Sequence, residues 1–398
     1  MRSLVFALLI LSRPLFAQST FDLQGYVAAR SINATGPESW LAGDVGRLED
    51  GGHRNDFTGA AQLGFDWAPS RYFDIHASGA ARRDPKELGG NSSGLVEAYA
   101  DARAIFGGNE VQLRAGQFFL PSSRENKGDL WTSPYAISFS ALNTWIAEEV
   151  RPAGVDLEWR HTFGSGHVLT TAATGFRGND SMGALLGWRG WSIGNRLTTY
   201  NEVLPLPPLP SFQTFFADQR HDGTQPFGED LDGNTGVSAR IRYSIPQRAN
   251  VQYLYLDNRA DRHLYQGEYA WATDFHLISA EAGNPDNIIV AAEYMTGSTG
   301  MGFAPAFVQA DFYATYVLLS EKVGRTRWTV RYDLFGTQEK DFSLAGGNDE
   351  SGRSWTLAWL YTLTPSIRFG TEFTQIAGHR ANAAMDGHSY TVEARYTF

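Results

Sequence analysis

Alternation of apolar and charged residues over about ten positions is the feature that most limits what this chain can form. In residues 325–335 (RTRWTVRYDLF), Trp328, Val330, Tyr332 and Leu334 share one face, and the opposite face carries three arginines and an aspartate. A period of two residues indicates a β-strand with one apolar and one polar side. Ten residues of a strand tilted by about 40° span about 25 Å, the height of the apolar band on an outer-membrane barrel.

About sixteen segments of this kind recur along the chain. Clear examples are residues 57–67, 154–163, 236–245, 353–363 and 366–376. Glycine (42 residues) and aromatic residues (13 %) are abundant while the mean hydropathy is only −0.30, as expected when half of each strand faces water. The net charge of −10 predicts no nucleic-acid partner, and the absence of cysteine excludes thiolate metal sites and cysteine nucleophiles.

The connections between these segments alternate in length. Short turns rich in Pro, Gly and Asn occur at residues 68–71, 107–109, 164–166, 246–248, 321–325 and 364–366. Longer polar stretches separate them at residues 32–56, 84–94, 119–149, 179–234, 260–266, 298–306, 337–352 and 377–387. This pattern predicts an all-β protein, a transmembrane antiparallel up-and-down β-barrel of about 16 strands with short periplasmic turns and long extracellular loops. The alternative is a soluble β-sandwich, whose core would be unusually wide.

The last strand shows how such a sheet avoids an exposed edge. In residues 390–398 (YTVEARYTF), one face is apolar and the other carries Thr, Glu and Arg. If the first strand is residues 21–30, the beginning of this strand and the end of the last strand both lie on the short-turn side. The last strand can then pair with the first, which closes the barrel and removes the free edge.

The N-terminus has the features of a secretory signal. Arg2 supplies a positive charge, residues 4–11 are apolar, and residues 16–18 provide a cleavage point. We therefore predict a signal peptide at residues 1–17 and an outer-membrane barrel at residues 18–398, with an interfacial anchor or a buried strand as the alternative for the first segment. No later apolar run reaches the roughly 18–20 residues that a transmembrane helix needs. The predicted location is the bacterial outer membrane.

The terminal stretch YTVEARYTF resembles the assembly signal of bacterial outer-membrane β-barrel proteins, with Phe398 at the end and Tyr396 two residues before it. The strand count and the long connection after the fifth strand resemble the porins among them. Residues 111–126 (VQLRAGQFFLPSSREN) also resemble an element of the phosphate-selective porin O/P-like group. The resemblance implies outer-membrane lipid, the barrel assembly machinery and small polar solutes as partners, and a homotrimer as the assembly.

The polar faces of the strands provide candidate pore-lining residues. Because so many charges would be costly to bury dry, we expect a hydrated lumen, and about 16 strands are wide enough for a channel. The loop at residues 119–149 is predicted to fold inward as a charged constriction, with an outward surface loop as the alternative; residues 179–234 are predicted to be extracellular. The predicted pore-lining and constriction residues are Arg103, Arg114, Arg124, Glu125, Arg240, Arg242, Arg327, Arg331, Asp101 and Asp311.

These features together predict a porin that gives passive diffusion of small hydrophilic solutes or ions. A plugged barrel whose long loops bind a surface partner is the alternative, and a barrel enzyme is a further one. Residues 90–94 (GNSSG) match G-x-S-x-G, but they lie in a Gly/Ser loop without a following helix, so no catalytic residue is predicted. Asp230, Asp232 and Asn234 offer oxygen donors but lack the EF-hand pattern, so neither a metal nor a cofactor is predicted.

Overall fold

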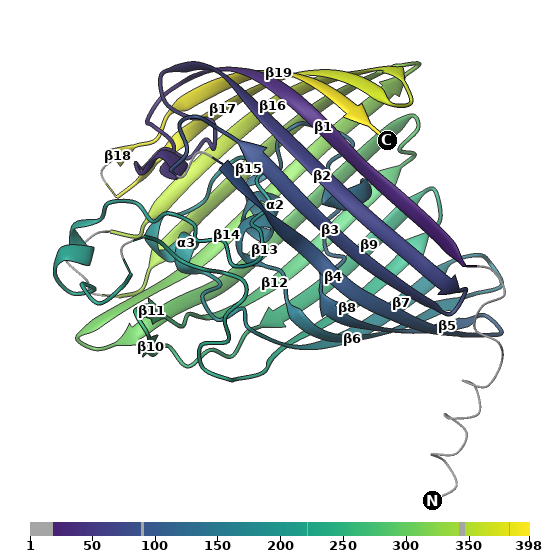
Figure 1. Cartoon of the computed structure of the whole chain (residues 1–398), viewed down its shortest axis with the longest axis horizontal. Coiled ribbons are helices and arrows are strands. Elements are labelled where there is room, and N and C mark those ends of the chain that lie inside the picture. Colours follow the sequence, from purple (N-terminus) through teal and green to yellow (C-terminus); the bar gives the residue numbers. More distant parts are fainter. Residues whose placement is uncertain (1–18, 89–90, 221, 342–346, 382) are drawn as a thin grey trace, which may run out of the picture.

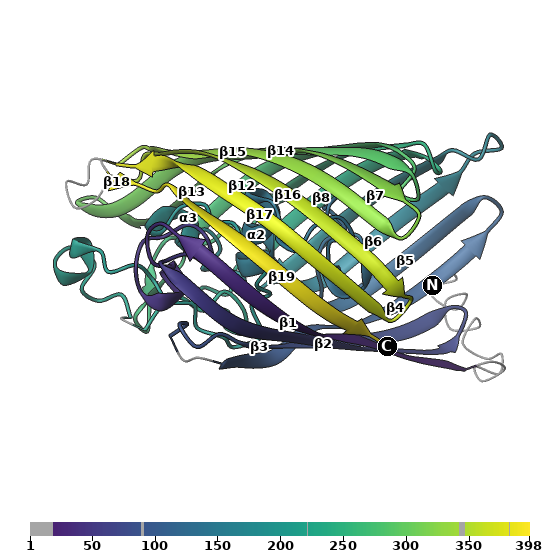
Figure 2. The ribbon, with the colours of Figure 1, turned by 90° about the horizontal axis from the view of Figure 1, so that it is seen from above.

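The computed structural model describes residues 19–88, 91–220, 222–341, 347–381 and 383–398; the predicted signal peptide at residues 1–17 lies outside the described residues. Sixteen strands form one closed antiparallel barrel, in which neighbours along the chain pair with each other (Figures 1 and 2). The strands are β1 (Thr20–Thr35), β2 (Arg54–Ser70), β3 (Phe73–Arg83), β4 (Asn91–Phe106), β5 (Asn109–Gln117), β6 (Ala153–Thr162), β7 (Val168–Arg177), β8 (Gly236–Ile245), β9 (Ala249–Asp257), β12 (Ala272–Gly283), β13 (Ile288–Phe303), β14 (Ala306–Val323), β15 (Thr326–Glu339), β16 (Glu350–Thr364), β17 (Ile367–Arg380) and β19 (Gly387–Thr397). The predicted fold class is confirmed.

The two faces of each strand differ as the sequence pattern predicts. On β15 the outward side chain of Trp328 is 57 % exposed, whereas the inward Arg331 and Asp333 are fully buried. On β19 the outward Tyr396 is exposed and the inward Glu393 is buried. A continuous apolar outer face is stable in contact with lipid tails, so the wall crosses the membrane with its ionic groups turned inward.

The first and last strands close the barrel. β1 and β19 pair from Tyr26 opposite Thr397 to Thr35 opposite His388. The terminal residue Phe398 extends this ladder. Its N–H donates to the carbonyl oxygen of Gly25 at 3.0 Å, and its carbonyl oxygen accepts the N–H of Gly25, also at 3.0 Å. The edge that the last strand would otherwise expose is therefore paired.

Short turns gather at one end of the barrel, and most of the long connections lie at the other (Figure 1). A short turn at residues 284–287, between β12 and β13, is one that the sequence pattern did not indicate. The predicted loop at residues 298–306 is instead a continuous hairpin, in which β13 runs to Phe303 and β14 begins at Ala306. This stretch is rich in Gly, Ser and Thr, whose small side chains hide the apolar–polar alternation.

The barrel wall is uneven in height. β5 to β9 contain 9 or 10 residues each, whereas β13 to β17 contain 14 to 18. The two longest connections, residues 118–152 and 178–235, start from short strands and carry α2 (Ala141–Glu149) and α3 (Ala184–Trp188). Both helices lie within the outline of the barrel (Figure 1). The shorter elements are β10 (Leu264–Tyr265), β11 (Glu268–Tyr269), β18 (Ala383–Ala384) and the 3₁₀ turns η2 (Trp40–Ala42), η3 (Asp129–Trp131) and η4 (Pro210–Gln213).

None of the helices in the described part of the chain has the length and apolar character needed to cross a membrane.

Candidate pore and the loops inside it

Residues 118–152, the luminal loop, pack against the inside of the wall. Every residue of α2 is buried, and Trp145 meets Phe275 on β12 and Phe312 on β14 at ring-centroid distances of 5.5 and 5.4 Å. The hydroxyl of Ser140 caps the helix by accepting the N–H of Asn143 at 3.2 Å. Edge-on aromatic contacts of this kind bury a large apolar area and hold the helix against the wall.

Three wall carboxylates on alternate strands hold the luminal loop by its backbone. Glu293 on β13 accepts the N–H of Arg124. Asp333 on β15 accepts the N–H of Ala141 at 3.1 Å, and Glu372 on β17 accepts two further loop N–H groups at 2.6 and 3.0 Å. A carboxylate buried alone would be costly, and these charge-assisted hydrogen bonds compensate for the loss of water.

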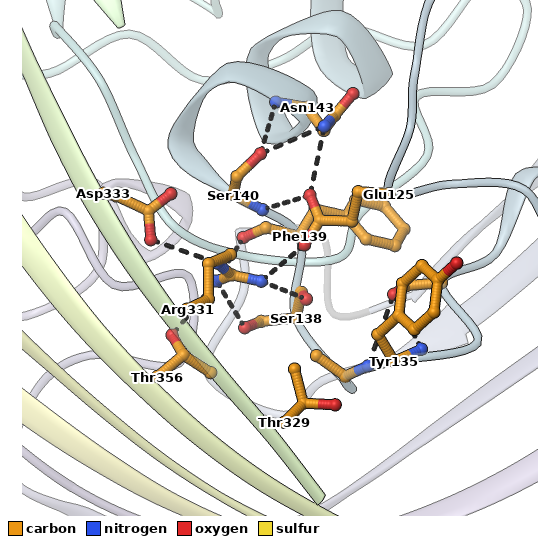
Figure 3. A network of polar contacts seen from close by, with 12 residues as sticks. Glu125, Tyr135, Ser138, Phe139, Ser140, Asn143, Thr329, Arg331, Asp333 and Thr356 are labelled. Atoms are coloured by element: carbon orange, nitrogen blue, oxygen red, sulfur yellow. Dashed lines mark hydrogen bonds and ion pairs between the residues drawn. The ribbon is translucent and has the colours of Figure 1, made fainter. Parts of the chain in front are cut away.

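One arginine completes this attachment (Figure 3). Arg331 on β15 donates from Nη1 to Glu125 Oε1 at 2.7 Å and from Nε to Asp333 Oδ2 at 3.0 Å. It also donates to the carbonyl oxygens of Ser138 and Phe139, both at 2.9 Å. The second oxygen of Glu125 accepts two hydrogen bonds from residues at the start of α2, at 2.8 and 3.1 Å. Arg331 therefore ties the wall to the luminal loop through a fully buried ion pair.

Residues 178–235 form a second loop, whose first part, residues 179–199, also lies in the lumen. Arg189 forms a fully buried, two-pronged ion pair with Glu148 at 3.1 and 2.8 Å. Trp191 meets Trp145 at 5.9 Å and donates its indole N–H to a wall carbonyl oxygen at 3.0 Å. The segment predicted to be extracellular is thus partly luminal, because its apolar side chains pack on α2.

Glu149 joins the two loops. Its Oε2 accepts the indole N–H of Trp145 at 2.6 Å and the N–H of Gly183 at 3.2 Å, and its Oε1 accepts the N–H of Leu185 at 3.0 Å. Burial raises the pKa of Glu149 to about 8, although these hydrogen bonds oppose the change. Burial also raises the pKa of Glu148.

This pKa shift predicts that the junction of the two loops weakens as the pH rises. The folded protein retains the Glu149 proton up to pH about 8, whereas the unfolded chain releases it near the ordinary value of 4.5. The free energy of local opening is therefore largest at a pH below 4.5. As the pH rises it falls by up to about 1.4 kcal/mol per pH unit, and it reaches its minimum above the folded-state pKa. Hydrogen exchange of Gly183 and Leu185, taken as the ratio of wild type to Glu149→Gln at each pH, should follow this fall. A ratio that does not change with pH would contradict the prediction.

Most of the predicted pore-lining residues are engaged in ion pairs. The pairs are Arg103–Asp74, Arg114–Asp101, Arg240–Asp156 and Arg331–Glu125. Arg327 donates to the hydroxyl of Ser320 at 3.0 Å and to a carbonyl oxygen at 2.6 Å. Among the described residues, no carboxylate forms an ion pair with Arg124 or Arg242.

Asp311 lies on the outer face of the barrel, so its prediction as a pore-lining residue was wrong. On β14 the buried inward residues are Ala310 and Phe312, and Asp311 between them pairs with Lys340 Nζ at 3.2 Å. Asp311 is near the long-loop end of its strand, where outward side chains leave the apolar band and meet polar headgroups. Near the end of a strand, a polar side chain therefore does not indicate that the residue faces the lumen.

The half of the lumen nearest the short turns, here called the vestibule, is open to solvent. Inward ionic side chains remain partly exposed there, to 49 % for Arg160, 39 % for Asp66 and 32 % for Arg103. The lumen is therefore wet at this end and densely packed around α2. The lumen is thus hydrated over only part of its length, because around α2 the loops supply hydrogen-bond partners that make buried charges tolerable.

A polar cavity lies along β1 to β4, away from the β14–β15 wall on which α2 packs. Its volume is about 20 Å³, which is room for about one water molecule, and it is lined by Tyr26, Ala60, Gln62, Ala80, Arg82, Ser92, Asn195, Leu197 and Thr199. Nearby, Arg30, Arg368 and Arg395 surround the carboxylate of Glu393 at 2.9 to 3.0 Å. Inward parity on β17 and β19 is the sequence signal that marks Arg368, Arg395 and Glu393 as residues facing the lumen.

Three acidic side chains of the loop at residues 178–235 lie close together. Carboxylate oxygens of Asp180, Asp230 and Asp232 lie within 4.8 Å of one another. Burial, and then the neighbouring carboxylates, raise the pKa of Asp180 to about 6. The amide nitrogen of Asn234 donates to Asp232 at 3.0 Å, and the third acidic residue is Asp180, which is remote in the sequence from the predicted oxygen donors.

Comparison with known proteins identifies the fold. No protein-family model matches the sequence, and no curated protein matches it. Among solved structures, the outer membrane channel DcaP of Acinetobacter baumannii has a TM-score of 0.58 at 12 % identity, over 96 % of this chain and 98 % of that chain. OmpF of Salmonella typhi in complex with daunomycin has a TM-score of 0.53 at 12 % identity, over 95 % and 97 %. OmpT, an outer membrane protein of Vibrio cholerae, in its trimer form has 0.52 at 10 %, over 96 % and 99 %.

At these identities the likeness establishes the fold, which is that of a porin-type β-barrel of the bacterial outer membrane. The comparisons provide no sequence-family support for the phosphate-selective group that residues 111–126 resemble.

Proposed function

We propose that this chain is an outer-membrane channel through which small hydrophilic solutes or ions diffuse passively. The observation that carries the proposal is the polar cavity along β1 to β4. The cavity exists because the side chains of Ala60 and Ala80 are small, and Gln62 and Arg82 make its walls polar. Since the luminal loops fill the rest of the middle of the barrel, we expect a narrow pore of low conductance.

The charges beside this cavity support a selective narrow point. Three arginines share the single carboxylate of Glu393, so this part of the wall is positively charged. Arg82 pairs with Glu49 and Glu87, which places acidic groups on the loop side. Charges of opposite sign across a narrow aqueous path create a transverse field that sorts solutes by charge and dipole.

A plugged barrel with partner-binding outer loops is the second candidate. The observation in its favour is the apolar cluster within the lumen, which includes Trp145, Trp191 and Phe312. An enzymatic function has less support, since the wall carboxylates Glu293 and Glu372 are engaged by loop N–H groups rather than free beside a nucleophile.

Single-channel recording in planar bilayers separates these candidates. The channel predicts stepwise ohmic conductance, and Ala60→Phe should reduce it severalfold because the new ring fills the cavity. Ala173→Phe on β7 adds the same ring to the exposed outer face and should leave conductance unchanged. Folded protein that shows no conductance, or an Ala60→Phe variant that conducts like the wild type, would contradict this pathway.

A homotrimer is the assembly that we propose. The outer faces of β2 to β5 carry small side chains where other strands carry aromatic ones. These residues are Gly59, Ala61, Ala77, Gly79, Ala81, Ala98, Ala100, Ala102, Ala104 and Ala115. Small residues allow close approach of protein surfaces within a bilayer. Cross-linking in native membranes tests this assembly.

A further inference from the structure

Arginines on the inner wall of this barrel typically have carboxylate partners. Arg240 on β8 shows the arrangement, because its Nη1 and Nη2 donate to the two oxygens of Asp156 at 2.8 Å each. Nη2 also donates to Glu158 Oε2 at 2.8 Å. The charge of Arg240 is thereby compensated within the wall, and Glu158 is occupied.

Arg242 lies two residues further along the same face of β8 and lacks such a partner. It is half-buried, and no hydrogen bond or ion pair joins it to another described residue. Its neighbours in register are Thr170 on β7 and Gln252 on β9, and both are uncharged. The hydroxyl of Thr170 is buried and has no hydrogen-bond partner among the described groups.

A second incompletely paired guanidinium comes from the luminal loop. Arg124 is only 5 % exposed, and its Nε is buried without a hydrogen-bond partner. Its Nη2 is at 3.4 Å from Gln252 Oε1 and at 3.4 Å from the carbonyl oxygen of Pro121, which are long contacts. Because Gln252 faces both Arg124 and Arg242, the two guanidinium groups flank the same side chain.

The vestibule lies close to these two guanidinium groups. Arg160, Thr170, Arg242 and Gln252 form one lateral row across β6, β7, β8 and β9. The side chain of Arg160 in this row is 49 % exposed. β8 ends at Ile245, so Arg242 lies only about 10 Å from the short-turn end of the barrel.

We propose that Arg124 and Arg242 form a binding site for the carboxylate or phosphate group of a small anion at the inner end of the vestibule. A guanidinium presents N–H groups in a fork that matches the oxygens of such anions. Neither guanidinium forms an ion pair with a carboxylate of the described residues, and two such partly desolvated positive charges favour a bound counter-ion. The Thr170 hydroxyl and the Gln252 amide provide further hydrogen bonds. The site goes beyond the proposed channel, because an anion can enter the vestibule without crossing the barrel.

Calorimetric titration of folded, detergent-solubilised protein tests this site. Inorganic phosphate and acetate are titrated separately at low ionic strength, and the stronger of the two identifies the preferred group. Arg242→Gln should weaken binding by about tenfold to a hundredfold, the effect expected for the loss of a charge-assisted hydrogen bond. Arg248→Gln removes the same charge from the exposed turn of the same hairpin and should bind like the wild type.

The outcomes separate this site from the channel proposal. Wild-type protein that binds neither anion, or equal binding by the Arg242→Gln and Arg248→Gln variants, would overturn the site. Heat-modifiable mobility in electrophoresis verifies that both variants are folded. A barrel that conducts without binding these anions contradicts only the site, and a barrel that binds them without conducting contradicts only the channel.

Discussion

Replacing Arg331 by Met should release the luminal loop from the wall and raise single-channel conductance severalfold. The substitution removes the donors for Glu125, Asp333 and two loop carbonyl groups, while the methionine keeps most of the side-chain volume. Glu125 would then be a fully buried carboxylate without its ionic partner. Removing one partner of a buried ion pair destabilises the structure by about 3–5 kcal/mol. This exceeds the stabilisation that a few neutral hydrogen bonds of the loop provide.

The double variant Arg331→Met/Glu125→Gln distinguishes loss of the ion pair from loss of the arginine alone. Removing both charges leaves one buried carboxylate of this group, Asp333, without its ionic partner, so conductance should return part of the way toward the wild-type value. Arg353→Met is a suitable control, since Arg353 is an exposed residue on β16. A folded Arg331→Met protein with wild-type conductance would show that the three wall carboxylates hold the loop without the arginine.

The wall of the barrel could be predicted from sequence because lipid imposes a period of two on every spanning strand. In β15, Trp328 and Val330 must face lipid and Arg331 must face the lumen, independently of the conformation of the loops. The prediction failed where composition hides the period, as in the Gly- and Thr-rich end of β13. It failed again at Asp311, because the outer face becomes polar at the end of the apolar band.

The interior could be predicted only in part. Parity along β15 places Arg331 inside the barrel, but its partner Glu125 lies 206 residues away in the sequence. No local pattern specifies such a pairing, since it depends on where the luminal loop meets the wall. The same is true of Arg189 and Glu148, which come from two different loops. The sequence pattern also does not show that buried charges are tolerated. The backbone N–H groups that compensate them belong to irregular loop segments, whose positions no periodicity predicts.

Phe398→Ala should reduce the amount of folded protein in the outer membrane to a small fraction of the wild-type level. The resemblance of the last strand to assembly signals implies that the barrel assembly machinery recognises the terminal aromatic side chain. The phenyl ring of Phe398 is 48 % exposed, so alanine removes little internal packing. The two backbone hydrogen bonds with Gly25 do not require a ring, and purified Phe398→Ala protein should therefore refold in detergent like the wild type.

Two further variants separate recognition of the terminus from closure of the barrel. Phe369→Ala on β17 removes an aromatic ring of similar exposure from the same end of the barrel and should assemble normally. Gly25→Val retains Phe398, but a Cβ atom at Gly25 would lie 2.6 Å from the carbonyl oxygen of Gln62 and 2.8 Å from the Phe398 ring. This variant should fail to close both in cells and in detergent. If Phe398→Ala also fails to refold in detergent, the terminal ring acts in closure of the sheet, and its role as a recognition signal would have to be abandoned.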